Sequence, residues 1–439
     1  MNQCKYVAVI VMVSMGLYSS DGKANEPSPL SSTATSVDIS SNPAAVNIAT
    51  GNGAAQKYID KVFGIKNNHG IIFGGAWVGD INQLFSGGIP HPDKTTTNSL
   101  LLLDLRLDTE KLNGWKGGLF GVQFLQLNAQ NTNFQAGTVQ GYNSIPGPPP
   151  LNRSELYQLW YRQAFFDGKF IFRIGKTVPT YDFGNVIKPV ALEKGNPTIP
   201  AVSGLIFTPL FINPTMLGTM PGYYNSAYGI TLNFAPIKEW YLSYGLYDGN
   251  LARGEQTGLH GTPTFNGAHF QIAETGATWL QGTLKKPGTF AVGIWNQHGK
   301  LQSPPTVSEN NTAGFYFFGS QRLWYKNPGS DNSGVSGYYQ YGYNKSRAML
   351  MNKSIGTGLT AFGLVPHRFD DSFGVGATFA WMNKNKFNHQ NELILQAYYQ
   401  ANVINGVYLE PVISYIPTPA SNGTRNNAWA GTLRAIVLF

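Results

Sequence analysis

Apolar side chains alternate with small or polar ones along the C-terminal stretch 429–439. One face carries Trp429, Gly431, Leu433, Ala435, Val437 and Phe439, whereas the other carries Arg434 as its only charge. A strand between lipid and an aqueous lumen must show apolar groups on one side only, and bacterial outer-membrane barrels commonly end in such a strand with a terminal aromatic residue. The stretch therefore favours a transmembrane β-barrel. The alternative is an ordinary edge strand of a soluble protein.

Similar alternating segments of about ten residues recur along the chain between turns. The clearest span 100–108, 155–164, 169–176, 223–234, 289–297, 373–381 and 391–401. In the first of them, Asp104, Arg106 and Asp108 share one face and leucines share the other. With a first strand at 71–79, the segments predict an all-β, transmembrane antiparallel barrel of about 16 strands, a size that leaves an aqueous channel.

The composition is consistent with this class of protein. Charged residues make up 12% of the chain, whereas soluble proteins usually contain about 25%. Aromatic residues reach 13%, and no apolar run beyond the N-terminal segment approaches the roughly 20 residues of a membrane helix. Soluble β-sandwiches can share the enrichment in Tyr and Gly, so composition supports the barrel without proving it.

The connections between segments alternate in length. Long ones fall at 80–98, 128–153, 177–222, 249–267 and 417–428, whereas short ones fall at 109–116, 165–168, 235–238 and 402–405. Long loops on one side and tight turns on the other are the arrangement of outer-membrane barrels. The stretch 323–334 is long for a turn and fits least well.

The N-terminal region predicts export. Lys5 precedes an apolar run at 6–18 that is too short to cross a bilayer as a helix, and Gly22-Lys23-Ala24 offers a cleavage site. We expect a signal peptide at 1–24, which contains the sole cysteine, Cys4. Residues 25–64 then predict a flexible extension with a candidate short helix, before a barrel domain at 65–439. The alternative for that helix is a segment that frays in solvent.

The longest predicted loop, 177–222, contains seven prolines and cannot be additional strand. In sixteen-stranded porins the corresponding third loop commonly folds into the lumen and narrows it, and we expect the same here. The candidate contributors to the narrowing are Tyr181, Asp182, Lys188, Glu193 and Lys194. The alternative is a surface loop that covers the outside of the barrel.

Several short motifs follow one another in a fixed order between residues 65 and 439. They are GGAWVGD at 74–80, LDL at 103–105, LNGWKGG at 112–118, ELYQLWYRQ at 155–163, DGK at 167–169, RIGK at 173–176, the segments 270–276, 287–299 and 314–323, GLTAF at 358–362, and 409–417 with LEP and YIP. In this order they resemble the carbohydrate-selective porin family, often called the OprB family. The resemblance implies an outer-membrane porin for passive, substrate-preferring diffusion of small carbohydrates, such as monosaccharides, into the periplasm.

A sugar channel needs groups that hydrogen-bond hydroxyls and aromatic faces that stack on a pyranose, all binding weakly enough for the solute to leave. The candidates for the channel lining are Asp104, Arg106, Asp108, Trp160, Arg162, Arg173 and Glu274. Their alternative role is a structural charge ladder on the barrel wall.

The chain also departs from the family. Gln158 and Arg162 stand where the family tends to place acids, and Gln396 and Ser414 also look like substitutions. Together with a formal net charge of +8, these departures leave a general or anion-preferring porin as the alternative function.

Other functions have less support. No constellation indicates a nucleophile, a metal or a cofactor, and His260, His269 and His298 show no ligand spacing. We therefore expect no enzyme activity, although a barrel enzyme and a secreted sugar-binding protein remain rivals. The expected partners are small sugars as permeants, outer-membrane lipid and lipopolysaccharide, the barrel-assembly machinery through the last strand with Phe439, and further copies of the chain in a homo-oligomer. Nucleic acid is not expected.

Overall fold

The structure of the chain is a computed structural model. It describes residues 69–147, 150–184, 186, 204–221, 224–237, 239–248, 265, 269–303, 307–328, 333–404, 406–421 and 426–438. The predicted signal peptide, the extension with its candidate helix, Lys188, Glu193, Lys194 and Phe439 lie outside these residues. Within the part of the chain that the structure describes, no helix is long and apolar enough to cross a membrane.

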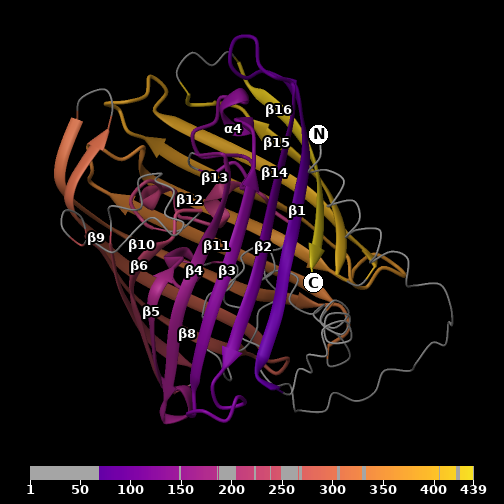
Figure 1. The fold of residues 1–439 in the computed structure, drawn as a ribbon. Coiled ribbons are helices and arrows are strands. Elements are labelled where there is room, and N and C mark those ends of the chain that lie inside the picture. The colour runs from indigo at the N-terminus through magenta and orange to yellow at the C-terminus, as the bar shows by residue number, and fades with distance from the viewer. Residues whose placement is uncertain are drawn as a thin grey trace.

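Sixteen antiparallel strands form one closed barrel (Figure 1). The strands are β1 (Ile71–Ser86), β2 (Thr95–Asp108), β3 (Gly118–Asn128), β4 (Asn152–Phe165), β5 (Phe170–Thr177), β6 (Ala227–Ile237), β7 (Trp240–Asp248), β8 (His269–Gln281), β9 (Lys286–Ser303), β10 (Val307–Tyr325), β11 (Gly334–Asn344), β12 (Met351–Phe362), β13 (Ser372–Met382), β14 (Asn391–Ile404), β15 (Val407–Ile416) and β16 (Ala428–Leu438). Each strand pairs with its neighbours in the sequence, and β1 pairs with β16 to close the barrel. The predicted all-β barrel is confirmed, and closure removes the unpaired edges that a membrane does not tolerate.

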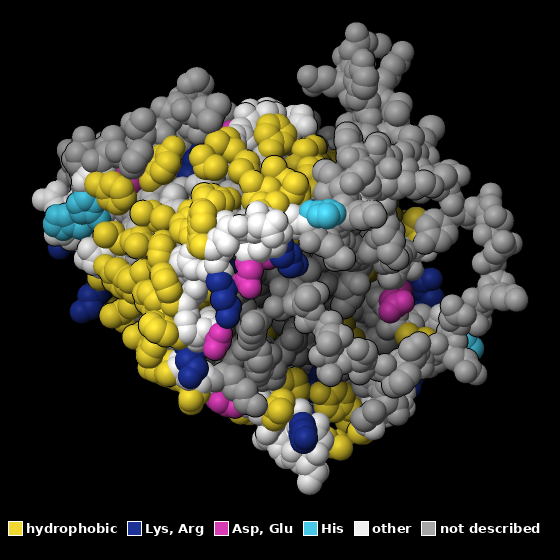
Figure 2. Space-filling model, turned by 60° about the horizontal axis from the view of Figure 1, so that its bottom comes forward, with side chains coloured by type: hydrophobic (Ala, Val, Ile, Leu, Met, Phe, Trp, Pro, Cys, Tyr) yellow, Lys and Arg dark blue, Asp and Glu magenta, His cyan; other side chains and the backbone are white. Residues whose placement is uncertain are grey.

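Alternation along the strands separates a lipid-facing wall from the lumen. In β16, Leu433 is 49% exposed on the outside, whereas the neighbouring Arg434 is 6% exposed on the inside. In β2, Asp104 and Arg106 lie inward and Leu105 lies outward. Figure 2 shows hydrophobic side chains over much of the outer wall, with Lys, Arg, Asp and Glu side chains in small groups beside it. The parity that the sequence predicted for these strands is therefore correct.

Several strands extend further than the sequence pattern indicated. β1 continues to Ser86 instead of ending at residue 79, so the first connection is 87–94 and not 80–98. The added part includes Asp80 and Asn82, which pair in register with Arg434 and Thr432. Pairing with two neighbours keeps the segment extended although its outward residues are no longer uniformly apolar.

The two sides of the barrel differ in the length of their connections. By the general rule of long extracellular loops and short periplasmic turns, the outer side carries the connections 129–151 and 178–226, and the inner side carries turns such as 166–169 and 405–406. Two connections of the outer side do not follow the rule, because few residues separate β9 from β10 and β11 from β12. Next to the first of these, β9 and β10 reach 18 and 19 residues, so the strands themselves extend the outer rim.

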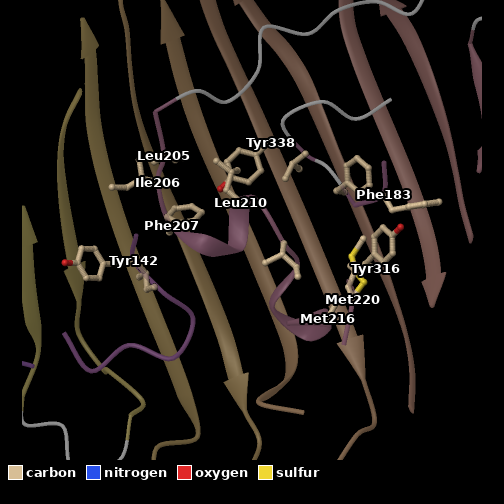
Figure 3. Packing of buried hydrophobic residues seen from close by; sticks show 14 of the residues in the cluster. Tyr142, Phe183, Leu205, Ile206, Phe207, Leu210, Met216, Met220, Tyr316 and Tyr338 are labelled. Carbon is tan, nitrogen blue, oxygen red and sulfur yellow. The ribbon is translucent and has the colours of Figure 1, made fainter. Parts of the chain in front are cut away.

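The described residues of the 178–226 connection (178–184, 186, 204–221 and 224–226), called the 178–226 loop below, lie in the lumen, as expected from the sequence. Its apolar side chains, among them Phe207, Leu210 and Met216, join one buried cluster with tyrosines of the strands. Figure 3 shows Leu210 beside Tyr338, and Met216 and Met220 beside Tyr316. Each apolar side chain buried in this way contributes about 1.5–3 kcal/mol, so the loop is held like part of a core.

Polar contacts fix the same loop to the wall. The Gln396 side-chain oxygen accepts from the backbone amides of Ile206 and Phe207, at 2.7 and 3.2 Å. Gln340 donates to the Pro209 carbonyl at 2.7 Å, and Asn344 donates to the Thr215 carbonyl at 2.8 Å. These contacts lie on β11 and β14, so the loop crosses the lumen and covers the wall opposite β2 to β5.

Candidate functional site in the barrel lumen

Three inward arginines lie on one wall of the barrel, on β2, β4 and β5. Arg162 on β4 and Arg173 on β5 are direct partners in the strand register. Arg106 on β2 and Trp160 on β4 flank the same residue of β3, Gly121. All three arginines are less than 9% exposed. The structure thus brings the three arginines and Trp160 together on β2 to β5. They are four of the seven residues that the sequence predicts to line the channel.

Trp160 lies flat against the wall. A Cβ atom on Gly121 would meet its indole ring at 2.3 Å, so only glycine leaves room for the ring there. The guanidinium carbon of Arg173 lies 5.5 Å from the ring centroid, which is within cation–π range. The indole therefore positions Arg173, and its 4% exposure leaves little face for a sugar in this conformation.

Asp104 lies beside the arginines and begins a chain of amides. Gln123 donates to its carboxylate at 2.6 Å, and Gln158 donates to the Gln123 oxygen at 2.7 Å. A β-bulge shifts the register between Gln123 and Phe124, so Tyr157 and Gln158 both lie buried on the lumen side. This polar row joins β2, β3 and β4 at one level of the wall.

Two of the predicted site residues lie apart from this group. The Asp108 carboxylate accepts from the backbone amides of Glu110 and Lys111, at 3.1 and 3.3 Å, and so caps the turn after β2. Glu274 on β8 accepts from the Tyr241 and Tyr316 hydroxyls and from the Gly184 amide, at 2.7–2.8 Å. Glu274 is 1% exposed and anchors the 178–226 loop.

The same loop reaches the arginine group through Asp182. The Asp182 carboxylate pairs with Arg173 and accepts from the Thr231 hydroxyl. Tyr181, the neighbouring residue, is buried among the side chains of the second apolar cluster. Burial raises the pKa of the Tyr181 phenol well above its ordinary value, so this group stays neutral. Of the five residues expected to narrow the lumen, these two are therefore inside it.

A second loop, 129–151, also enters the lumen, which the sequence analysis did not predict. It contains the short helix α4 (Thr132–Gln135). Its backbone amides at Val139 and Gln140 donate to the Glu392 carboxylate of β14, at 2.9 and 2.8 Å. Thr138 and the Ala420 amide donate to the same carboxylate, at 2.7 and 2.8 Å. No sequence signal links these segments, because Glu392 lies 252 residues from Gln140.

The 129–151 loop also contacts a buried ion pair. Arg434 donates two hydrogen bonds of 2.8 Å to the Asp80 carboxylate. Asn143 of the loop donates to Asp80 at 2.7 Å and accepts from Arg434 at 3.2 Å. The pair joins β1 to β16. Asn143 thereby bonds the loop to both strands at the point where the barrel closes. The sequence marked Arg434 as an inward charge but gave no partner.

The inner surface of the barrel is therefore divided. The inner faces of β15, β16, β1, β2, β4 and β5 form a charged wall, defined by Glu410, Arg434, Asp80, Asp104, Arg106, Arg153, Glu155, Arg162, Arg173 and Lys176. The inner faces of β7 to β11 and β14 contribute mainly aromatic and aliphatic side chains to the cluster with the 178–226 loop. Among described charges on that opposite side, Glu274 and Glu392 bind loops, and Arg322 packs over the rings of Tyr325 and Phe362.

Two histidines come together on the outside. His269 and His298 are direct partners across β8 and β9, with parallel rings 6.1 Å apart. Among the described residues, no group of three or more His, Cys, Asp or Glu side chains could hold a metal ion.

A closed sixteen-stranded barrel with an apolar outer wall, a charged inner wall and loops folded into the lumen defines an outer-membrane porin. The sequence model of the carbohydrate-selective porin family, OprB family, matches residues 94–439, and the chain belongs to this family. The protein is accordingly a carbohydrate-selective porin of the bacterial outer membrane, and its family and fold are those of a channel.

Solved structures agree on the fold. The chain is similar to the high-pH structure of Pseudomonas putida OprB with a TM-score of 0.73 and 16% identity, over 88% of this chain and 97% of that one. It is also similar to the low-pH structure of the same protein, with a TM-score of 0.55 and 14% identity, over 88% of this chain and 97% of that one. No curated protein sequence matches this chain significantly.

Proposed function

We propose that small sugars, with monosaccharides as the preferred size, cross the barrel along the charged wall between β2 and β5. The observation that carries this proposal is the group of Arg106, Arg162 and Arg173 beside Asp104, on the wall that faces the 178–226 loop. Guanidinium and carboxylate groups hydrogen-bond sugar hydroxyls, and a row of such groups offers many weak sites in succession. The two inward loops leave less room than an open barrel of this size, which favours small solutes.

Within this proposal, the seven residues differ in role. Arg106, Arg162, Arg173 and Asp104 contact the solute, and Trp160 positions Arg173. Asp108 and Glu274 act structurally, on a turn and on a loop. A diffusion channel needs no catalytic group, and we propose no enzyme activity.

Swelling of liposomes that contain the purified protein tests the function. Glucose and arabinose should enter faster than an uncharged amino acid of similar size, and a disaccharide should enter more slowly, because hydroxyl recognition adds to size exclusion. Entry that follows size alone would establish a general porin. Swelling with none of these solutes would contradict a channel for small solutes.

The alternative, an anion-preferring porin, is favoured by the excess of arginine at the same site. The double variant Arg106→Gln/Arg162→Gln should shift the reversal potential in a salt gradient toward cations, because two positive charges leave the wall. Two exposed lysines of one turn provide a matched control, and Lys111→Gln/Lys116→Gln should leave the reversal potential nearly unchanged. A sugar preference that persists while the ion preference changes would separate the two functions. An unchanged reversal potential in the double variant would show that these arginines do not face the conducting path.

Further proposals concern the ends of the chain and its partners. We propose that 1–24 is removed on export, which N-terminal sequencing of the mature protein tests directly, and that 25–64 is a flexible extension.

The barrel-assembly machinery would recognise the last strand with Phe439, so deletion of Phe439 should lower the amount of assembled barrel. Association into a homo-oligomer is also proposed, and the mass of the protein in detergent tests it.

A further inference from the structure

A group of exposed basic side chains lies at the outer rim of β11 to β14. Lys345 and Arg347 lie on the 345–350 connection, Lys353 begins the outward face of β12, and Lys384 lies on the 383–390 connection. These four exposed residues are called the outer basic patch, and Lys386 and His389 lie next to it. The segments 341–353 and 381–391 contain no Asp or Glu.

The patch is held rigidly. Asn383 donates to the carbonyls of Ser346, Arg347 and Met349, at 2.8–3.4 Å, and so fastens one connection to the other. The Ser346 hydroxyl accepts from the amides of Ala348 and Met349, both at 3.0 Å. Since the backbone is already ordered, binding of a ligand there costs little conformational entropy.

One acid lies under the patch. The Glu309 carboxylate of β10 accepts from the Ser346 hydroxyl at 2.6 Å and from the Arg347 amide at 3.1 Å. It is thus used to hold the backbone of the connection, and the four cations of the patch outnumber it. The net charge of the patch remains positive.

The level of the patch relative to the membrane follows from its aromatic neighbours. The Lys353 ammonium lies 5.9 Å from the centroid of the Tyr343 ring, and Lys353 is the register partner of Trp381. Trp381 is 40% exposed on the outer wall. Tyr and Trp of membrane proteins gather at the interface with water, and a lysine on the lipid-facing wall at this level reaches the headgroups.

From this placement we infer that the outer basic patch binds a phosphorylated glycolipid of the outer leaflet. Lys353 and Trp381 contact its lower part at the wall, and Lys345, Arg347 and Lys384 bind its phosphates above the rim. This site lies outside the lumen and is independent of the path of the sugar.

Binding of defined lipids to the purified full-length protein in detergent tests the inference. The probes are a lipid A with two phosphates, the same lipid A without phosphates, and inorganic phosphate. The patch variant combines Lys345→Gln, Arg347→Gln, Lys353→Gln and Lys384→Gln. The control variant removes the same charge from exposed lysines of the opposite rim and combines Lys111→Gln, Lys116→Gln, Lys169→Gln and Lys285→Gln.

The wild type and the control variant should bind bisphosphorylated lipid A equally. The patch variant should bind it at least about tenfold more weakly, because each basic residue near an anionic surface contributes appreciably. Equal binding by the patch variant would overturn the inference. Equal binding of the dephosphorylated lipid to the wild type would also overturn it, because the association would then be apolar only. Equal binding of inorganic phosphate would overturn it as well, because the site would then be one for soluble anions. The last two comparisons use the wild type alone and do not depend on whether the patch variant folds.

Discussion

Replacement of Arg434 by alanine should lower the free energy of unfolding of the barrel by about 3–5 kcal/mol, since it leaves the buried Asp80 carboxylate without its cation. The Asp80 side chain is fully buried, and Arg434 reaches it with two hydrogen bonds of 2.8 Å. The pair also closes the barrel between β1 and β16 and holds Asn143 of the 129–151 loop. Unfolding of the protein by denaturant, followed by tryptophan fluorescence and by mobility in unheated gels, measures the loss.

A second ion pair, whose arginine is partly exposed, supplies the control. Arg368 lies 2.8 Å from the Asp371 carboxylate at the turn after β12, but its side chain is 42% exposed. The Asp371 side chain is buried but also accepts from the Tyr399 hydroxyl and the Asn402 amide, so its carboxylate keeps two partners when Arg368 is lost. Arg368→Ala should therefore cost clearly less than Arg434→Ala. Equal losses for the two variants would contradict the assignment of Arg434 to a desolvated closure of the barrel. The double variant Asp80→Asn/Arg434→Gln should lose less than Arg434→Ala, since it leaves no unpaired charge.

Replacement of Glu392 by alanine should release the 129–151 loop from the wall of β14. The carboxylate accepts from Thr138, Val139, Gln140 and the Ala420 amide. Its loss leaves several buried donors unpaired, which costs the anchored loop about 3 kcal/mol or more. The single-channel conductance should rise, and the discrimination between glucose and a disaccharide should weaken, because the loop no longer narrows the lumen.

Planar-bilayer recordings and liposome swelling measure these two effects. Glu110 is an exposed glutamate on a turn at the opposite end of the barrel. Glu110→Ala therefore makes the same change of charge away from the 129–151 loop. The control should match the wild type in both measurements. An unchanged conductance of Glu392→Ala in a folded barrel would show that the 129–151 loop does not limit the path.

Periodicity in the sequence predicts which residues face the lumen, because a strand between lipid and water alternates with period two. It therefore placed Arg106, Arg162 and Arg173 correctly on the inner wall. The same rule fails at a bulge, where Tyr157 and Gln158 both lie buried on one side. It also missed the outer half of β1, where polar residues such as Asn82 continue the strand.

The partners of inward residues could not be predicted, because they come from distant parts of the chain. Arg434 lies 354 residues from Asp80, and Glu274 lies 90 residues from Gly184. Parity marked Glu274 as a lumen acid, but only the packed loop shows that its carboxylate is used to hold that loop. For the same reason, the entry of the 129–151 loop into the lumen became visible only in the structure.

Sugar is proposed to pass along the charged wall of β2 to β5. Sugar-induced current noise in single channels tests this path most directly, with the wild type, Arg106→Gln, and Arg322→Gln as an arginine variant on the opposite wall. Glucose should modulate the current of the wild type and of Arg322→Gln, and should do so much more weakly in Arg106→Gln. Equal modulation in Arg106→Gln, or its loss in Arg322→Gln alone, would contradict this path.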